Sequence, residues 1–159
     1  MPCIGITGHR GLPPRTQALI TAVLRKELEP HAGAELVGVS CLAGGPDQLF
    51  ARTVLHLGGT LEVVVPAEQY RDGLEPDEQQ GYDELLAEAK HVERLPFIES
   101  TEQAHLAAGQ AVADRSDRLV AVWDGKPARG IGGTADVVSY ARHRGVPVIV
   151  LWPEGATRE

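Results

Sequence analysis

Three short segments carry residue types that can bind an anion, and each follows an apolar run typical of a buried strand. They are residues 7–11, 40–47 and 124–134. In the third segment, Gly132, Gly133 and Thr134 come directly before a run with helical periodicity. Glycines at this position let backbone N–H groups approach an anion at the positive end of a helix. We therefore predict that a phosphate group binds at these three residues.

Charged side chains in the same segments extend this prediction. Arg10 can hold a phosphate or carboxylate through two parallel hydrogen bonds, although a solvated arginine is the alternative. Asp47 falls in the first turn of a predicted helix, where it either complements the helix dipole or accepts from a ribose or base. Asp124 follows a predicted strand and is expected to face the ligand. The predicted ligand-binding residues are Gly8, His9, Arg10, Ser40, Gly44, Gly45, Asp47, Asp124, Gly132, Gly133 and Thr134.

Several common site motifs are absent from the sequence. Residues 5–11 do not match the glycine pattern of dinucleotide-binding proteins, because Thr7 stands where the middle glycine is required. There is no phosphate-binding loop of the Gly-x-x-x-x-Gly-Lys type and no Gly-x-Ser-x-Gly motif. The two cysteines, Cys3 and Cys41, fall in predicted strands and are interpreted as reduced thiols. We therefore predict neither a metal site nor a cofactor.

The composition predicts one soluble domain. The 159 residues are enough for a single core, which we place in residues 1–153, with a frayed tail at 154–159. The chain carries 15 basic and 22 acidic residues, a net charge of −7, which argues against a nucleic-acid partner. No apolar run approaches the length of a membrane span, and no leader is evident, so we expect a cytoplasmic protein without membrane contact.

Strand-like and helix-like patterns alternate along the chain. Strands are predicted over residues 3–7, 35–42, 61–65, 92–96, 119–123 and 146–151. Helices are predicted over residues 15–31, 46–57, 82–91 and 100–115, with Ser100 as the cap of the fourth, and after Thr134. Residues 67–81 are predicted to be irregular, as either a lid or a surface loop, with Gly73, Pro76 and Gly81 as breakers. This alternation predicts a three-layer α/β/α Rossmann-like sandwich with a mainly parallel sheet.

The order of these motifs resembles the SLOG superfamily over nearly the whole chain, and is most similar to its stand-alone bacterial members. The matching segments are Gly5 to Arg10, Ser40 to Ala51, Ser116 to Gly125 and Gly132 to Thr134. This superfamily includes the Smf/DprA DNA-processing proteins and the Lonely Guy (LOG) hydrolases. The resemblance implies a nucleotide-type small molecule as ligand, with phosphate at Gly132 to Thr134. It also implies a homodimer or higher homo-oligomer.

The resemblance leaves the activity open. LOG enzymes carry a catalytic glutamate three residues after the threonine of their glycine motif, and Val137 occupies that position here. Asp136 precedes it by one residue and would point about 100° away around a helix. One interpretation is therefore a nucleotide-binding module, for example a sensor of a nucleotide signal. The alternatives are a LOG-like phosphoribohydrolase or nucleoside deoxyribosyltransferase, with Asp124, Asp136 or Asp47 as catalytic carboxylate, and single-stranded DNA binding as in Smf/DprA proteins.

Overall fold

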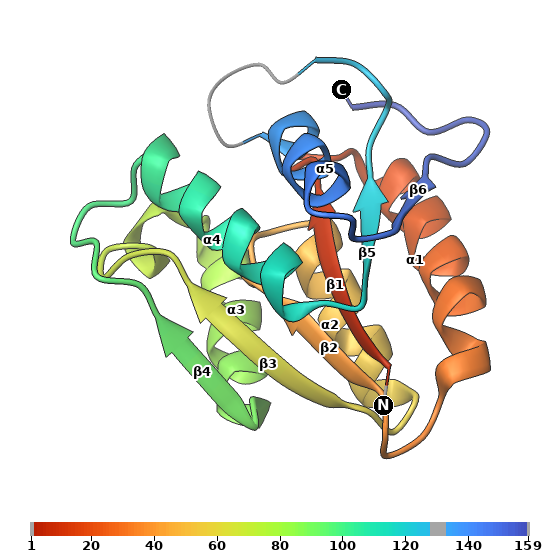
Figure 1. The fold of residues 1–159 in the computed structure, drawn as a ribbon, viewed down its shortest axis with the longest axis horizontal. Coiled ribbons are helices and arrows are strands. Elements are labelled where there is room, and N and C mark those ends of the chain that lie inside the picture. Colours follow the sequence, from red (N-terminus) through yellow and green to blue (C-terminus); the bar gives the residue numbers. More distant parts are fainter. Residues whose placement is uncertain (1, 128–132, 159) are drawn as a thin grey trace.

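A computed structural model describes residues 2–127 and 133–158 of the chain. Its centre is a six-stranded sheet in the order β4-β3-β2-β1-β5-β6, and every neighbouring pair of strands is parallel (Figure 1). The strands are β1 (Cys3–Gly8), β2 (Val37–Ser40), β3 (Thr60–Val65), β4 (His91–Arg94), β5 (Arg118–Val122) and β6 (Val148–Leu151). The predicted Rossmann-like sandwich is confirmed, with a sheet that is parallel throughout.

Helices cover both faces of the sheet and make the other two layers. They are α1 (Pro14–Leu28), α2 (Pro46–His56), α3 (Pro76–Glu88), α4 (Glu102–Arg115) and α5 (Thr134–His143), with short 3-10 helices η1 (Glu29–His31) and η2 (Arg71–Gly73). The first three helices pack on one face, and α4 and α5 pack on the other (Figure 1). The central strands are apolar on both sides, as expected for a parallel sheet enclosed between helices.

The strand order reverses beside β1. From β1 the chain builds outward through β2, β3 and β4, then returns to place β5 and β6 on the other side of β1. In open parallel sheets, ligands bind outside the carboxyl ends of the strands near such a reversal. Gly8 ends β1 at this edge, and a side chain at that position would collide with Pro46 and Val122. The strand therefore needs glycine for packing, whatever Gly8 contributes to a ligand.

The segment predicted to be irregular is better ordered than the sequence analysis expects. Pro76 does not break structure but occupies the first turn of α3, where its missing N–H has no cost. Gly81 also lies inside α3. A Cβ atom at this position would collide with the Gln48 side chain, so glycine suits the contact. The predicted cap of α4 is wrong by one residue. Thr101, and not Ser100, accepts the hydrogen bond from the Ala104 amide, at 3.1 Å.

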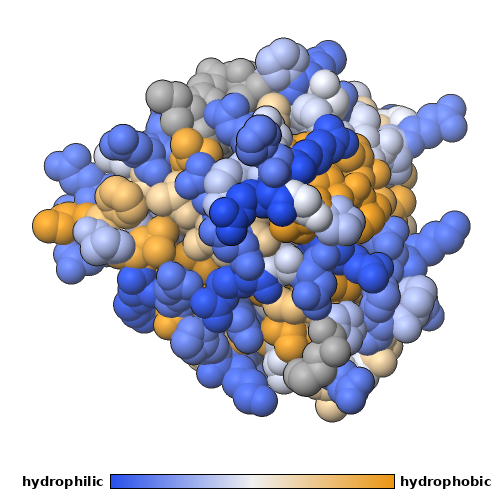
Figure 2. Space-filling view, viewed as in Figure 1, coloured by the Kyte–Doolittle hydropathy of each residue, from blue (hydrophilic) through white to orange (hydrophobic). Residues whose placement is uncertain are grey.

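Polar and charged side chains cover most of the face shown in Figure 2, with smaller apolar areas between them. Within residues 2–127 and 133–158, no helix combines the length and the hydropathy needed to cross a bilayer.

Candidate functional site

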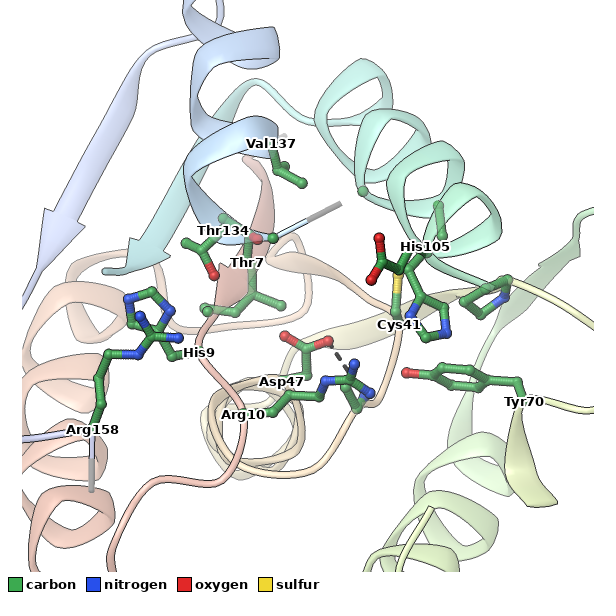
Figure 3. Close-up of a pocket in the computed structure, with 18 residues that line it drawn as sticks. Thr7, His9, Arg10, Cys41, Asp47, Tyr70, His105, Thr134, Val137 and Arg158 are labelled. Carbon is green, nitrogen blue, oxygen red and sulfur yellow. Dashed lines mark hydrogen bonds between the residues drawn. The ribbon is translucent and has the colours of Figure 1, made fainter. Parts of the chain in front are cut away.

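A cavity of about 390 Å³ opens at the carboxyl ends of β1, β2 and β3, between α2 and the two helices of the opposite face (Figure 3). This volume falls within the range of small-molecule sites, roughly 300 to 1,000 Å³. The segments that follow several strands therefore meet in one place, as predicted. The cavity is lined by Ile6, Thr7, Gly8, His9, Arg10, Cys41, Ala43, Asp47, Pro66, Tyr70, Glu102, His105, Ala108, Gly109, Gly133, Thr134, Val137 and Arg158.

The amino terminus of α5 forms one end of the cavity. Gly133 caps this helix, and its carbonyl accepts from the backbone N–H groups of Asp136 and Val137 at 3.1 and 3.2 Å. The N–H groups of a helix's first turn have no carbonyl partner within the helix and carry its positive dipole end. Gly133 and Thr134 both line the cavity, so this end suits an anion. Gly132, which belongs to the same prediction, lies outside the described residues.

Arg10 enters the cavity from the segment that follows β1. Its guanidinium lies between Asp47 and Tyr70 in the view of Figure 3. Within the described ranges 2–127 and 133–158, Arg10 has no hydrogen-bond or ion-pair partner, and its charge acts on the Asp47 carboxyl through space. Arg10 is exposed, and its positive charge makes this wall of the cavity attractive to an anionic ligand.

His9 takes a structural position beside Arg10. Its ring is buried and packs edge-on against Trp152, with 5.8 Å between the ring centroids. Its Nε2 atom lies 3.2 Å from Oδ1 and 3.1 Å from the backbone nitrogen of Asp124. One nitrogen cannot donate to the carboxylate and accept from the amide at once, so the tautomer decides which bond forms. In either case His9 joins the end of β1 to the end of β5.

Asp124 connects this pair to the far end of the chain. Its Oδ2 lies 3.6 Å from the Nη1 atom of Arg158, and Oδ1 accepts from the Lys126 amide at 3.0 Å. Burial alone would raise the pKa of Asp124, but the Lys126 amide, His9 and Arg158 together lower it. Asp124 is therefore an ionised anchor for Arg158. It does not line the cavity itself.

Arg158 belongs to the segment predicted to be a frayed tail. In the structure, this segment is held against α1, because the backbone N–H and carbonyl of Thr157 both bond to the Thr16 hydroxyl, at 3.0 and 2.9 Å. The Arg158 side chain is 19% exposed and lines the cavity near His9 (Figure 3). No periodic pattern or glycine motif marks this residue, and only the fold brings it to the site.

Asp47 lies on the cavity wall at the start of α2. Its Oδ2 accepts from the Ala43 amide at 3.3 Å, whereas Oδ1 accepts no hydrogen bond within residues 2–127 and 133–158. Burial raises the pKa of Asp47 from 3.8 to about 7, against the opposing effects of the Ala43 amide and Arg10. Near neutral pH this carboxyl can therefore accept and donate hydrogen bonds.

The end of the cavity away from α5 is aromatic, which no sequence motif predicted. Tyr70 is buried, contacts His105 edge-on at 5.7 Å between centroids, and points its hydroxyl into the cavity (Figure 3). The Ser100 hydroxyl lies 2.7 Å from His105 Nε2, and burial lowers the pKa of His105. Cys41 also lines this end, and burial raises the pKa of its thiol well above the usual value. Cys41 is therefore protonated and unsuited to nucleophilic attack.

Three other predicted residues lie beside the cavity without lining it. Ser40 is fully buried, donates to the Asp47 carbonyl at 3.1 Å and accepts from the Leu42 amide at 3.0 Å. Leu42 adopts a left-handed φ of 57°, which is rare for a bulky residue, and the Ser40 bond stabilises this turn. Gly44 is covered by the Glu78 side chain, and Gly45, with a φ of 81°, caps α2. These residues shape the turn that carries Asp47.

Of the three carboxylates predicted as catalytic candidates, only Asp47 lines the cavity, among the residues that the structure describes. Asp124 anchors His9 and Arg158, and Asp136 lies on the first turn of α5 outside the cavity lining. Val137 does line the cavity and is almost fully buried against Gly109. The position that the LOG resemblance assigns to a catalytic glutamate therefore presents methyl groups to a ligand.

Comparison with solved structures identifies the fold. DNA processing protein A (DprA) from Streptococcus pneumoniae superposes with a TM-score of 0.71 over 98% of this chain, at 19% sequence identity. DprA from Helicobacter pylori gives 0.68 over 98% of the chain at 17% identity. The molybdenum cofactor binding protein from Rippkaea orientalis gives 0.61 over 96% at 15% identity. The chain shares the fold of the DprA proteins, as its resemblance to the SLOG superfamily predicts.

The likeness concerns part of each relative. The chain spans 52% of the S. pneumoniae DprA chain, 68% of the H. pylori one and 77% of the molybdenum cofactor binding protein. No protein-family model matches the sequence, and no curated protein sequence does. The comparisons therefore establish a shared fold.

The expectation against a nucleic-acid partner is wrong. It rested on the net charge of −7, yet a protein with the same fold, H. pylori DprA, is described as binding single-stranded DNA. Net charge is a sum over the whole surface, whereas a DNA strand contacts only part of that surface. An acidic composition therefore does not exclude such a partner.

Proposed function

We propose that this SLOG domain binds a nucleotide or nucleotide derivative in the cavity, with its phosphate at the amino terminus of α5. One observation carries the proposal. Gly133 and Thr134 line the same cavity as Arg10 and Arg158, two cations from opposite ends of the sequence. Backbone N–H groups and guanidinium groups are the usual ligands of phosphate oxygens in proteins.

The two arginines are complementary to an anion for different reasons. Arg10 has no ion-pair partner within residues 2–127 and 133–158. Arg158 is held by Asp124, but its contact at 3.6 Å leaves donors of the guanidinium available. Glu102 also lines the cavity, at the start of α4. A ligand that carries both a phosphate and a hydrogen-bonding ring is consistent with this mixture of charges.

Binding without bond cleavage is the activity we propose for this cavity. Hydrolysis of a nucleotide at the glycosidic bond needs a group that handles a proton or stabilises positive charge near the sugar. Val137, at the position of the LOG glutamate, supplies neither, and Asp124 is already bonded to His9 and Arg158. Asp47 is the remaining candidate in the cavity lining, and we assign it to ligand binding. Nucleotide sensing fits these residues better than LOG-type hydrolysis.

Isothermal titration with AMP, ADP, GMP and cyclic AMP tests the proposal. The informative variant is Gly133→Asp, because aspartate is a favoured helix cap but places a negative charge where the phosphate should bind. Like charges in such contact cost several kcal/mol, so affinity should fall about 100-fold while the fold is retained. Gly133→Ala, which keeps the backbone amides, and Arg25→Ala, on the exposed surface of α1, are the matched controls. Binding that Gly133→Asp leaves unchanged would refute the phosphate position.

Single-stranded DNA binding is the second candidate, and the fold shared with H. pylori DprA favours it. Fluorescence anisotropy with a labelled oligo-dT at increasing salt distinguishes it from nucleotide binding. A DNA-binding protein should lose affinity steeply with salt, because each phosphate contact releases a counterion.

A further inference from the structure

The two ends of the cavity differ in chemistry, and Asp47 lies between them. The helix end, with Thr134, offers amide donors, and the opposite end offers the aromatic rings of Tyr70 and His105. Figure 3 places the Asp47 carboxyl between these ends. A nucleoside monophosphate has the same order of parts, since its ribose lies between the phosphate and the base.

Asp47 also has an unused hydrogen-bonding atom. It is 8% exposed, and its Oδ2 is taken by the Ala43 amide. Its Oδ1 has no hydrogen-bond partner in residues 2–127 and 133–158. Because Asp47 lines the cavity, this oxygen is available to accept a hydrogen bond from a ligand there.

The polar groups nearest to Asp47 do not occupy its Oδ1 atom. Arg10 acts on the carboxyl through its charge without a hydrogen bond. The Ser40 hydroxyl is committed to the Asp47 backbone carbonyl and to the Leu42 amide. The Cys41 thiol is a weak donor whose pKa is raised well above the usual value by burial and by Asp47.

We propose that Asp47 accepts hydrogen bonds from the ribose hydroxyls of the ligand, so that the cavity selects ribonucleotides over 2′-deoxyribonucleotides. This inference rests on the proposed function. Ribose presents two neighbouring O–H donors, and a carboxyl in either protonation state can accept at least one of them. A 2′-deoxyribose in the same position would offer the carboxyl one O–H donor fewer.

The expected selectivity follows from the strength of that bond. Hydrogen bonds to charged groups contribute about 1.5 to 3 kcal/mol, so removal of one hydroxyl should weaken binding about 10- to 100-fold. If Asp47 only shaped the cavity, ribose and 2′-deoxyribose forms should bind equally.

The test compares AMP with 2′-deoxy-AMP, and GMP with 2′-deoxy-GMP, by isothermal titration. We expect the wild type to prefer the ribose form about 10- to 100-fold. In Asp47→Ala the ratio should approach one. Asp47→Asn is the second variant, for use if Asp47→Ala does not fold. It keeps the shape of the side chain and the acceptor for the Ala43 amide, and it should also reduce the ratio. Asp117→Asn is the control, because this carboxylate accepts from the Cys3 amide and does not line the cavity.

The outcomes separate the two proposals. If the wild type binds ribose and deoxyribose forms equally, the role of Asp47 is refuted and the proposed function stands. If a folded Asp47 variant keeps the wild-type ratio, another residue selects the sugar and the inference is equally wrong. If the wild type binds none of the four nucleotides, the proposed function itself fails.

Discussion

The buried carboxyl of Asp47 should make the stability of the protein depend on pH in an unusual direction. Its pKa is raised from 3.8 to about 7 in the folded state, mainly by burial. A folded state that holds its proton more tightly than the unfolded state is favoured at low pH. The contribution of Asp47 is therefore fully present below about pH 3.8 and is lost as the pH rises through about 7.

The size of the effect follows from the same shift. One pKa unit corresponds to about 1.4 kcal/mol, so the whole shift corresponds to about 4 kcal/mol. Between pH 5 and pH 8 the part lost is about 2 to 3 kcal/mol. Asp47→Asn cannot ionise. The free energy of unfolding of this variant, relative to wild type, should therefore rise by that amount over this range.

Urea unfolding at pH 5, 6, 7 and 8 measures this difference. Other groups that titrate in this range, such as His105, are present in both proteins and cancel. Asp83→Asn is the control: the hydrogen bond from Arg71 lowers the pKa of Asp83, so it is ionised throughout this range and its removal should shift stability by a constant. If the wild-type and Asp47→Asn curves run parallel from pH 5 to pH 8, the buried environment of Asp47 described here is wrong.

Three further substitutions test other parts of the structure. Thr101→Ala should destabilise the protein by about 1 kcal/mol in urea unfolding, because α4 loses its cap, whereas Thr101→Ser should not. Gly109→Ala should lower the free energy of unfolding by about 1 to 3 kcal/mol, because its Cβ would overlap Val137. Gly73→Ala is the control, because a Cβ atom there has open space and should be close to neutral. Equal thermal midpoints of the two variants would contradict the packing of α4 on α5. Arg158→Gln should weaken AMP binding about 10-fold or more in titration calorimetry without a change in fold, and undiminished affinity would remove Arg158 from the site.

The fold could be predicted because its signal is local. Each central strand is a short apolar run followed by glycine or proline, and each helix repeats its apolar residues at helical spacing. The errors have local causes as well. Pro76 and Gly81 were interpreted as breakers, but a proline suits a first helical turn and a glycine suits a crowded helix contact. The sequence does not show which of these uses applies.

The candidate site was predicted only where it follows the strands. Arg10, Asp47, Gly133 and Thr134 line the cavity because the carboxyl ends of parallel strands meet at one edge. Tyr70 and His105 escaped prediction because they reach the cavity from a connecting segment and from a helix face that the sequence marks as ordinary. Asp124 was predicted to face a ligand, but its partners are His9 and Arg158, which only tertiary structure brings together.

The hydrogen bonds between the Thr16 hydroxyl and the Thr157 backbone have a consequence for synthesis of the protein. Arg158 forms part of the cavity wall, and the hydroxyl on α1 holds the residue next to it. A nascent chain can complete its parallel sheet once β6 has left the ribosome, yet it still lacks this cation. Full affinity for a phosphorylated ligand should therefore arise only after residue 158 has emerged, so capture of the ligand would follow folding of the sheet.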